Sequence, residues 1–282
     1  MMSATQNLVS HDWLSAHISD PEIIVVDATV HLPDTGRNAQ AEYLSEHLPG
    51  ARFFDMDVIS DPDNPRPRKI PSAERFAQEV GKLGIHNGSH VVAYDTLGLY
   101  SAARVWWLFR QFGHDRVSVL DGGLVAWKNA GLPVAAEPPT IVPRSFSVSN
   151  LRGLLARWDD VLEQSNRRGH ILDARTQGRW AGTEVDRYPG ARPGHIPGSR
   201  CLYWGDLLDP DTRKLLPPDV LRAKFAAAGY VPDQPVLLSC GSGLTACILA
   251  LALEQIGGTG WKVYDGSWDE WGRNHDLPVE VS

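Results

Sequence analysis

Cys240 stands at the end of an apolar run and is followed directly by Gly-Ser-Gly. The run Val236–Ser239 predicts a buried strand, and the dense apolar residues from Leu244 onward predict a buried helix. A tight loop between a strand and a helix directs backbone N–H groups, and the positive end of the helix dipole, at whatever occupies the loop. A thiol held there loses its proton more readily than a free cysteine, and the thiolate is the reactive form. The stretch therefore predicts a reactive cysteine rather than a small buried hydrophobe.

Several chemistries of a cysteine loop need residues that this loop lacks. A cysteine phosphatase needs an arginine six positions after the cysteine, where the sequence has Ala246. A redox pair needs a cysteine in place of Gly243, and a phosphate-binding loop needs a lysine. A cysteine–histidine hydrolase stays open, with the histidine supplied from elsewhere. What remains is sulfur transfer, in which backbone N–H groups and the hydroxyls of Ser242 and Thr245 stabilise an anionic persulfide.

The other two cysteines are predicted to be structural. Cys247 lies one turn into the expected helix and Cys201 lies near the start of another expected strand, so we expect core or near-surface thiols. A total of three cysteines argues against a disulfide framework. No histidine pair with metal-ligand spacing accompanies them, so we expect no metal site and no cofactor.

Composition narrows the class of protein. The 282 residues suffice for two ordinary domains, and 43% hydrophobic with 22% charged residues is typical of a soluble globular chain. A net charge of -7 and a pI near 5.8 give no reason to expect a nucleic-acid partner or an anionic membrane surface. The N-terminal stretch has no targeting pattern and no apolar run is long enough to span a bilayer, so we expect a cytoplasmic protein.

The sequence contains an internal repeat. Four blocks of the first half recur in the same order in the second half, at an offset of roughly 145 residues. The matched blocks are IIVVDA with HILDAR, EHLPGA with GHIPGS, VVAYDTLGL with VLLSCGSGL, and SVLDGGLVAW with KVYDGSWDEW. Strands alternate with helices in each half, which predicts two α/β domains, each a parallel sheet flanked by helices.

The two halves are expected to differ in chemistry. The proline- and serine-bearing stretch 136–151 predicts a linker between a first domain at 8–135 and a second at 152–280. The repeat aligns Asp95 with Cys240, so only the second half carries a nucleophile. We therefore expect a catalytically silent first domain that supports the second and walls a cleft between them.

Along nearly its whole length the chain resembles the tandem-domain rhodanese-like sulfurtransferases. Its loop CGSGLTA is similar to the Cys-Gly-Ser/Thr-Gly-Val-Thr loop of the 3-mercaptopyruvate sulfurtransferases, whereas thiosulfate-preferring rhodaneses tend to carry basic residues directly after the cysteine. Thiosulfate is a small dianion that benefits from fixed positive charge, while mercaptopyruvate carries its charge on a carboxylate farther from the sulfur. The family blocks that contain His195, Trp268 and Trp271 are expected to be structural.

The resemblance implies arginines that bind the donor's carboxylate and keto oxygen. Arg179 is the best match. A second family arginine falls eight or nine residues later, where Arg187 is nearest, and Arg192 is a third option. Arginine suits this task better than lysine because it binds a carboxylate through two parallel hydrogen bonds. The loop that would hold the anionic sulfur consists of Gly241, Ser242, Gly243, Leu244 and Thr245.

One departure from the family lies in the first half. The family segment after FFDMD often carries a histidine proposed to join the active site, whereas this sequence has Arg66, Arg68 and Lys69 there and no histidine. Asp57 matches the family pattern. A cationic wall formed by this segment would favour an anionic donor, including thiosulfate. Asp57 and Arg68 are therefore candidate contributors to the cleft.

The predicted function is transfer of sulfur from 3-mercaptopyruvate through a persulfide on Cys240. The acceptor would be cyanide or a thiol, such as thioredoxin or a low-molecular-weight thiol. Thiosulfate:cyanide sulfurtransferase is the alternative within the same class. A non-catalytic persulfide carrier or docking protein, loaded by another enzyme, is the alternative from a different class.

Overall fold

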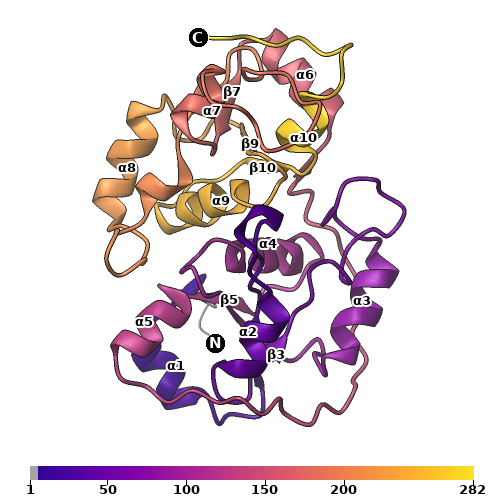
Figure 1. The fold of residues 1–282 in the computed structure, drawn as a ribbon, viewed down its shortest axis with the longest axis vertical. Helices are drawn as coiled ribbons and strands as arrows, with labels where there is room; N and C mark the ends of the chain where they lie inside the picture. The colour runs from indigo at the N-terminus through magenta and orange to yellow at the C-terminus, as the bar shows by residue number, and fades with distance from the viewer. Residues whose placement is uncertain (1–5) are drawn as a thin grey trace. The chain divides into compact units, whose positions relative to one another are not determined.

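The computed structural model describes residues 6–282 and divides the chain into two compact units (Figure 1). The first unit runs to Arg152 and also takes in Pro210–Lys214, while the second consists of Gly153–Asp209 and Leu215–Ser282. Each unit is built on a five-stranded sheet whose strands are all parallel. The prediction of two tandem α/β domains is confirmed.

The two units repeat the same succession of strands and helices. The first contains β1 (Leu8–Val9), α1 (His11–His17), β2 (Ile23–Asp27), α2 (Ala39–Ser45), β3 (Arg52–Phe53), α3 (Ala73–Lys82), β4 (His90–Tyr94), α4 (Ala102–Gln111), β5 (Val117–Leu120) and α5 (Gly123–Asn129). The second contains β6 (Leu155–Ala156), α6 (Trp158–Asn166), β7 (His170–Asp173), α7 (Gln177–Ala181), β8 (Arg200–Cys201), α8 (Pro218–Ala227), β9 (Val236–Ser239), α9 (Ala246–Gln255), β10 (Trp261–Tyr264) and α10 (Ser267–Trp271). Short 3-10 helices lie at Pro33–Thr35 and Trp204–Leu207. The strand orders, β1-β5-β4-β2-β3 and β6-β10-β9-β7-β8, are equivalent.

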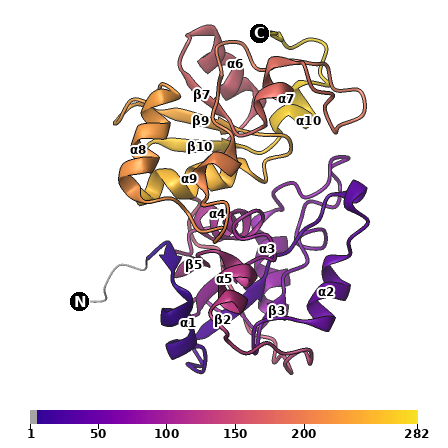
Figure 2. The ribbon, with the colours of Figure 1, turned by 60° about the vertical axis from the view of Figure 1, so that its left-hand side comes forward.

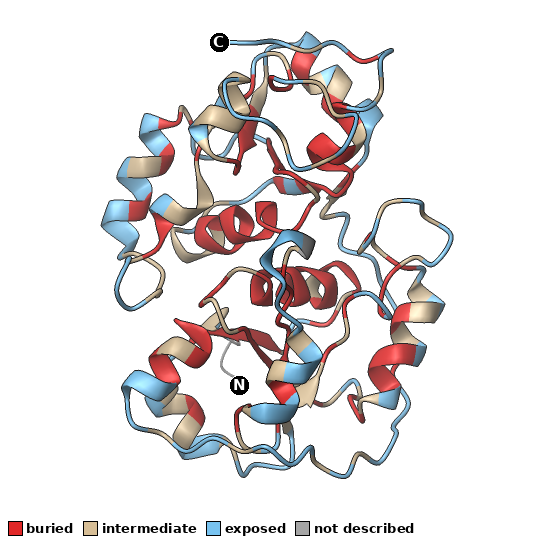
Figure 3. Ribbon diagram, viewed as in Figure 1, coloured by how far each residue is buried: buried red, intermediate tan, exposed pale blue. Residues whose placement is uncertain are grey.

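The sheet of the second unit is covered on both faces, which explains why its central strand β9 is buried from Val236 to Ser239. On one face, Leu237 of β9 and Ile171 of β7 pack with Val161 of α6 and Trp268 of α10. From the other side α9 contacts β9 and β10 (Figure 2). Helix α9 is apolar all round and buried from Ala246 to Leu253, as the colouring in Figure 3 shows.

The first unit is layered in the same way. Helices α1 and α5 cover one face of its sheet, where Leu14 and Trp127 pack on Val25 and Val92. The stretch 136–151 contains no helix or strand, and its Phe146 is buried against Phe76 of α3 and Phe109 of α4. The predicted linker therefore packs along the first unit. Within residues 6–282, no helix combines the length and the apolar character needed to cross a membrane.

Candidate active site

The cysteine loop follows β9, at the carboxyl end of the central strand. Helix α9 begins at Ala246, two residues later than expected, because Leu244 is buried in the loop rather than in the helix. Thr245 is the N-cap of α9, so the loop comprises residues 240–245. Cys240 is 1% exposed, and the backbone N–H of Gly243 donates to its Sγ at 3.1 Å. An N–H directed at the sulfur stabilises its anionic forms, both thiolate and persulfide.

The loop is fastened to the start of α10. The backbone N–H groups of Trp268 and Asp269 donate to the carbonyls of Cys240 and Gly241 at 3.0 and 2.8 Å. Gly243 has a φ of 83°, and a Cβ built on it would lie 2.6 Å from the carbonyl oxygen of Asp265. Only glycine fits this close approach. The DGSWDEW block, expected to be structural, therefore holds the cysteine loop in place.

Ser267 is a site residue that the sequence analysis missed. Its Oγ accepts a hydrogen bond from the Cys240 N–H at 3.0 Å, donates to the carbonyl of Tyr264 at 2.7 Å, and lies 3.8 Å from the Cys240 Sγ. Its φ is 50°, a left-handed conformation that is costly for a residue with a side chain. The equivalent position in the first unit is Gly123, with a φ of 52°. The difference between Gly123 in the first repeat and Ser267 in the second was the sequence signal that could have identified this residue.

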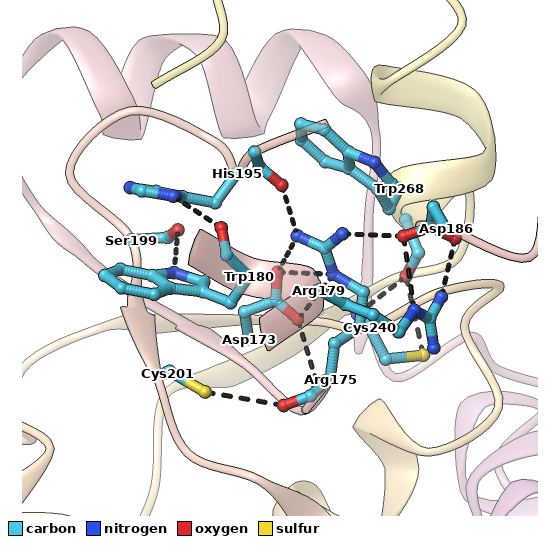
Figure 4. A network of polar contacts seen from close by, with 12 residues as sticks. Asp173, Arg175, Arg179, Trp180, Asp186, His195, Ser199, Cys201, Cys240 and Trp268 are labelled. Atoms are coloured by element: carbon cyan, nitrogen blue, oxygen red, sulfur yellow. Dashed lines mark hydrogen bonds and ion pairs between the residues drawn. The ribbon is translucent and has the colours of Figure 1, made fainter. Parts of the chain in front are cut away.

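A buried network of four charges lies beside the loop (Figure 4). Arg175 binds Asp173 at 2.8 Å through Nη2 and Asp186 at 2.9 Å through Nη1. Arg179 binds the other oxygen of Asp186 at 2.7 Å. Two arginines and two carboxylates balance, so the cluster is neutral overall. The side chain of Arg175 is 1% exposed and that of Arg179 is 11% exposed, so Arg179 is the more accessible of the two cations.

Asp186 links the two arginines and was not predicted from sequence. Burial raises its pKa, but hydrogen bonds and charge from Arg179 and Arg175 outweigh burial and hold the pKa below its ordinary value of 3.8. The carboxylate is therefore charged at neutral pH. Asp186 therefore already pairs with the charge of Arg179 in this structure.

The two other candidate arginines differ from Arg179. Arg187 is exposed, and its backbone N–H donates to Asp186 Oδ1 at 2.7 Å. Arg192 donates from its guanidinium to the carbonyls of Gly272, Asn274 and Leu277 at 3.0, 2.6 and 2.9 Å. These contacts give Arg192 a scaffold role.

Tyr188, nine residues after Arg179, covers the cysteine loop. A Cβ built on Gly241 would lie 2.5 Å from the Tyr188 hydroxyl. The hydroxyl is hydrogen-bonded to Ser242, and the Arg179 guanidinium carbon lies 5.8 Å from the centre of the ring. Nothing in the sequence singled out a tyrosine in a polar loop, because its contact with residues 241–242 exists only in the fold.

Comparison with known proteins agrees with this architecture. A family model described as a rhodanese-like domain matches residues 10–130 and again residues 157–274. The chain is 38% identical to the 3-mercaptopyruvate sulfurtransferase of Escherichia coli K12, over 98% of this chain and 99% of that protein. It is 41% identical to the thiosulfate sulfurtransferase of Cricetulus griseus, over 97% and 94% of the two chains. The chain belongs to the tandem-domain rhodanese-like sulfurtransferases.

Solved structures of other proteins share the whole fold. The crystal structure of SseA from Escherichia coli, a 3-mercaptopyruvate sulfurtransferase, matches with a TM-score of 0.85 and 38% identity, covering 94% of this chain and 99% of that one. Tum1 from Saccharomyces cerevisiae matches with a TM-score of 0.87 and 27% identity, covering 96% and 95%. Both similarities extend over the two domains of this sulfurtransferase.

The remaining thiols of this sulfurtransferase are held as hydrogen-bond donors. Cys201 Sγ donates to the carbonyl of Arg175 at 3.4 Å. Burial, and then the charge of Asp173, raises the pKa of Cys201 to about 12, so it stays a thiol at neutral pH. Cys247 is fully buried and donates to the carbonyl of Gly243 at 3.3 Å. Both arrangements agree with the structural roles expected of them.

The first domain's counterpart of the cysteine loop encloses a carboxyl group of its own. The carboxylate of Asp95, which aligns with Cys240, accepts backbone hydrogen bonds from Leu97 on Oδ1 and from Ser101 and Ala102 on Oδ2, each at 2.8 Å. The loop geometry that both repeats share is therefore able to bind negative charge. In the first domain the backbone N–H groups of this loop bind the side chain of Asp95.

The candidate cleft residues of the first domain bind each other. Arg68 donates to the two carboxylate oxygens of Asp57 at 2.8 and 3.1 Å. Lys69 is buried. The basic segment thus exposes less free positive charge than expected, and a role for Asp57 and Arg68 at Cys240 stays a prediction.

His195 has the scaffold contacts expected of it. It is 2% exposed, donates a hydrogen bond from Nδ1 to the carbonyl of Trp180 at 2.8 Å, and stacks on the Trp180 ring. It also lines a hollow of about 730 Å³ with His170 and Arg200, and Cys240 does not contribute to that hollow. Throughout the part of the chain that the structure describes, no three His, Cys, Asp or Glu side chains are grouped to hold a metal ion.

Proposed function

We propose that this sulfurtransferase moves a sulfur atom from 3-mercaptopyruvate to a thiol acceptor or to cyanide through a persulfide on Cys240. The Cys240 thiolate attacks the donor sulfur, an S–S bond forms, and the C–S bond breaks. The electron pair of the C–S bond leaves on carbon as the enolate of pyruvate, which takes up a proton to give pyruvate. The acceptor then attacks the outer sulfur, breaks the S–S bond and returns the Cys240 thiolate.

The observation that carries this proposal is the 3.1 Å hydrogen bond from the Gly243 N–H to Cys240 Sγ within a loop that has no charged side chain from 241 to 246. A backbone N–H stabilises the thiolate and the persulfide without adding fixed charge. A donor whose charge is remote from its sulfur suits such a loop. Arg179, the partly accessible guanidinium nearby, would bind that remote carboxylate.

Thiosulfate is the second candidate donor. A thiosulfate sulfurtransferase is 41% identical to this chain, and an Arabidopsis thaliana relative, 39% identical over 99% of this chain, is named for both donors. Arg179 would attract a dianion as well as a carboxylate. The names of the relatives therefore support both donors.

The acceptor and the location of the protein are further parts of the proposal. Thioredoxin, a low-molecular-weight thiol or cyanide would each supply the nucleophile that removes the outer sulfur. No nucleic-acid or membrane partner is proposed. A cytoplasmic location stays a prediction, and the Arabidopsis thaliana relative is named as mitochondrial.

The test is to map the persulfide and to measure turnover with both donors. Incubation with 3-mercaptopyruvate and no acceptor should add one sulfur, about 32 Da, to the Cys240 peptide. Cys240→Ser should abolish the adduct and the turnover, whereas the control Cys201→Ser should keep both. An adduct on Cys201 or Cys247 would refute the assignment of Cys240. Absence of turnover with either donor would instead support a carrier that another enzyme loads.

A further inference from the structure

Tyr188 is the side chain beside the cysteine loop to which the reaction above assigns no task. Its hydroxyl and ring contact the backbone of Gly241, where a Cβ would lie 2.5 Å from Oη and 2.8 Å from Cε2. The same hydroxyl is hydrogen-bonded to Ser242. Two residues earlier, Asp186 is fixed by its ion pairs to Arg175 and Arg179. The phenol is therefore anchored against Gly241 and Ser242, the two residues that follow Cys240.

The surroundings of Tyr188 keep its hydroxyl protonated. Burial raises the pKa of the phenol and the charge of Cys240 raises it further, against smaller lowering effects of Ser242 and Arg179. A protonated phenol is a hydrogen-bond donor. Arg179 lies next to the ring, with its guanidinium carbon 5.8 Å from the ring centre. The cysteine loop thus has one cation, Arg179, and one neutral hydrogen-bond donor, Tyr188, beside it.

The two candidate donors differ in their need for a neutral hydrogen-bond donor. When the C–S bond of 3-mercaptopyruvate breaks, negative charge develops on the keto oxygen of the enolate, and the product must gain a proton. When the S–S bond of thiosulfate breaks, the electron pair leaves on sulfite, which needs no proton. A hydrogen-bond donor directed at the keto oxygen therefore stabilises the transition state for 3-mercaptopyruvate and not the one for thiosulfate.

We propose that Tyr188 determines donor specificity, by donating a hydrogen bond from Oη to the keto oxygen of 3-mercaptopyruvate as the enolate forms. The inference rests on the proposed function and refines it. Tyr188 would favour 3-mercaptopyruvate through the chemical step, while Arg179 would bind the carboxylate of the same donor. The preference for 3-mercaptopyruvate over thiosulfate would then come from a side chain outside the cysteine loop.

The experiment compares Tyr188→Phe with the wild-type protein, using 3-mercaptopyruvate and thiosulfate side by side. Removal of one such hydrogen-bond donor should lower kcat for 3-mercaptopyruvate roughly a hundredfold, with little change in KM. The kcat/KM for thiosulfate should change by less than about threefold, because that reaction forms no enolate. Tyr230→Phe is the matched control. A Cβ on Gly258 would lie 2.9 Å from its hydroxyl, beyond the C-terminal end of α9, and both activities should be unchanged.

The possible outcomes separate this inference from the proposed function. A loss confined to 3-mercaptopyruvate supports it. An equal loss with both donors would show that Tyr188 only maintains the loop, and no loss would show that its hydroxyl does not reach the donor; each overturns the inference. If the wild-type protein forms the Cys240 persulfide from thiosulfate but does not turn over 3-mercaptopyruvate, the choice of donor in the proposed function is itself wrong.

Discussion

The Oγ of Ser267 accepts a hydrogen bond from the backbone N–H of Cys240 at 3.0 Å, and Ser267 does so from a backbone with a φ of 50°. The equivalent residue of the first domain is Gly123, which adopts nearly the same φ at little cost. The second domain therefore places a residue with a side chain in a left-handed backbone conformation that favours glycine. The strained residue also contacts Cys240, which points to a functional reason for the strain.

Two substitutions distinguish the effect of the Ser267 hydroxyl on the reaction from the effect of its backbone strain on stability. Ser267→Ala and Ser267→Gly both remove the hydrogen bond to Cys240, so we expect persulfide formation to slow by a similar factor in both. Ser267→Gly also relieves the left-handed strain, so it should be about 1 kcal/mol more stable than Ser267→Ala. Urea unfolding and the rate of persulfide formation measure the two effects. Equal stability of the variants would contradict the strain, and an unchanged rate would contradict the role of the hydroxyl.

Asp186 should make the protein more stable at neutral pH than in acid. The folded-state pKa of Asp186 lies below 3.8, so its stabilising contribution is present above the pKa of the unfolded chain and is lost as the pH falls through the folded-state pKa. Asp186→Asn should lower the free energy of unfolding at pH 7 by about 3 kcal/mol, since it leaves two buried arginines short of a partner. Denaturation between pH 7 and 3 should show the difference from wild type shrinking below about pH 4. A difference that stays constant down to pH 3 would argue against this coupling.

A cysteine at position 95 should not create a second active site. Asp95→Cys removes two oxygens that accept backbone hydrogen bonds from Leu97, Ser101 and Ala102. A single sulfur replaces them poorly, so we expect a loss of roughly 2–3 kcal/mol of stability. Mass spectrometry of Asp95→Cys in a Cys240→Ser background, after incubation with donor, should show no added sulfur. A persulfide at position 95 would mean that the loop of either repeat suffices for the chemistry.

Positive charge in the cysteine loop should shift the protein toward thiosulfate. Gly241 is unsuitable for this test because any side chain there displaces Tyr188. Ser242→Lys leaves Gly241 in place, and a cation a few ångströms from the sulfur should favour a dianion by roughly 1 kcal/mol or more. We expect a change of about tenfold in the ratio of the kcat/KM values for the two donors. Ser242→Ala is the control, because it removes the contact with Tyr188 without adding charge; the same ratio in both variants would exclude loop charge as the cause.

The fold was predictable because its signals are local or repeated. The apolar run that became β9, the loop that begins at Cys240 and the four repeated blocks each lie within a short stretch of sequence, and the tandem domains follow from them. The start of α9 was placed two residues early, since burial of Leu244 in the loop looks the same in the sequence as burial in a helix.

The surroundings of Cys240 were harder to predict because they depend on contacts between distant residues. Ser267 lies 27 residues after Cys240 in the chain. Asp186 and Tyr188 sit in a loop whose polar composition indicates only solvent exposure. Arg179 was singled out by resemblance to a family, and its pairing with Asp186 became visible only in three dimensions. The roles assigned to Cys240, Arg179 and the loop residues stay predictions for the experiments above.

The fastening of the cysteine loop to Ser267, Trp268 and Asp269 gives the protein an order of assembly during translation. Every one of these fastening partners is synthesised after the nucleophile. A ribosome that has just added Cys240 has made the thiol but not its surroundings, and at about 5–20 residues per second those surroundings emerge seconds later. Nascent chains, and fragments cut before residue 267, therefore carry the thiol without the hydrogen bonds that fix its loop. The hydrogen bonds that fasten the cysteine loop to α10 therefore form only after residues 267–269 have been synthesised.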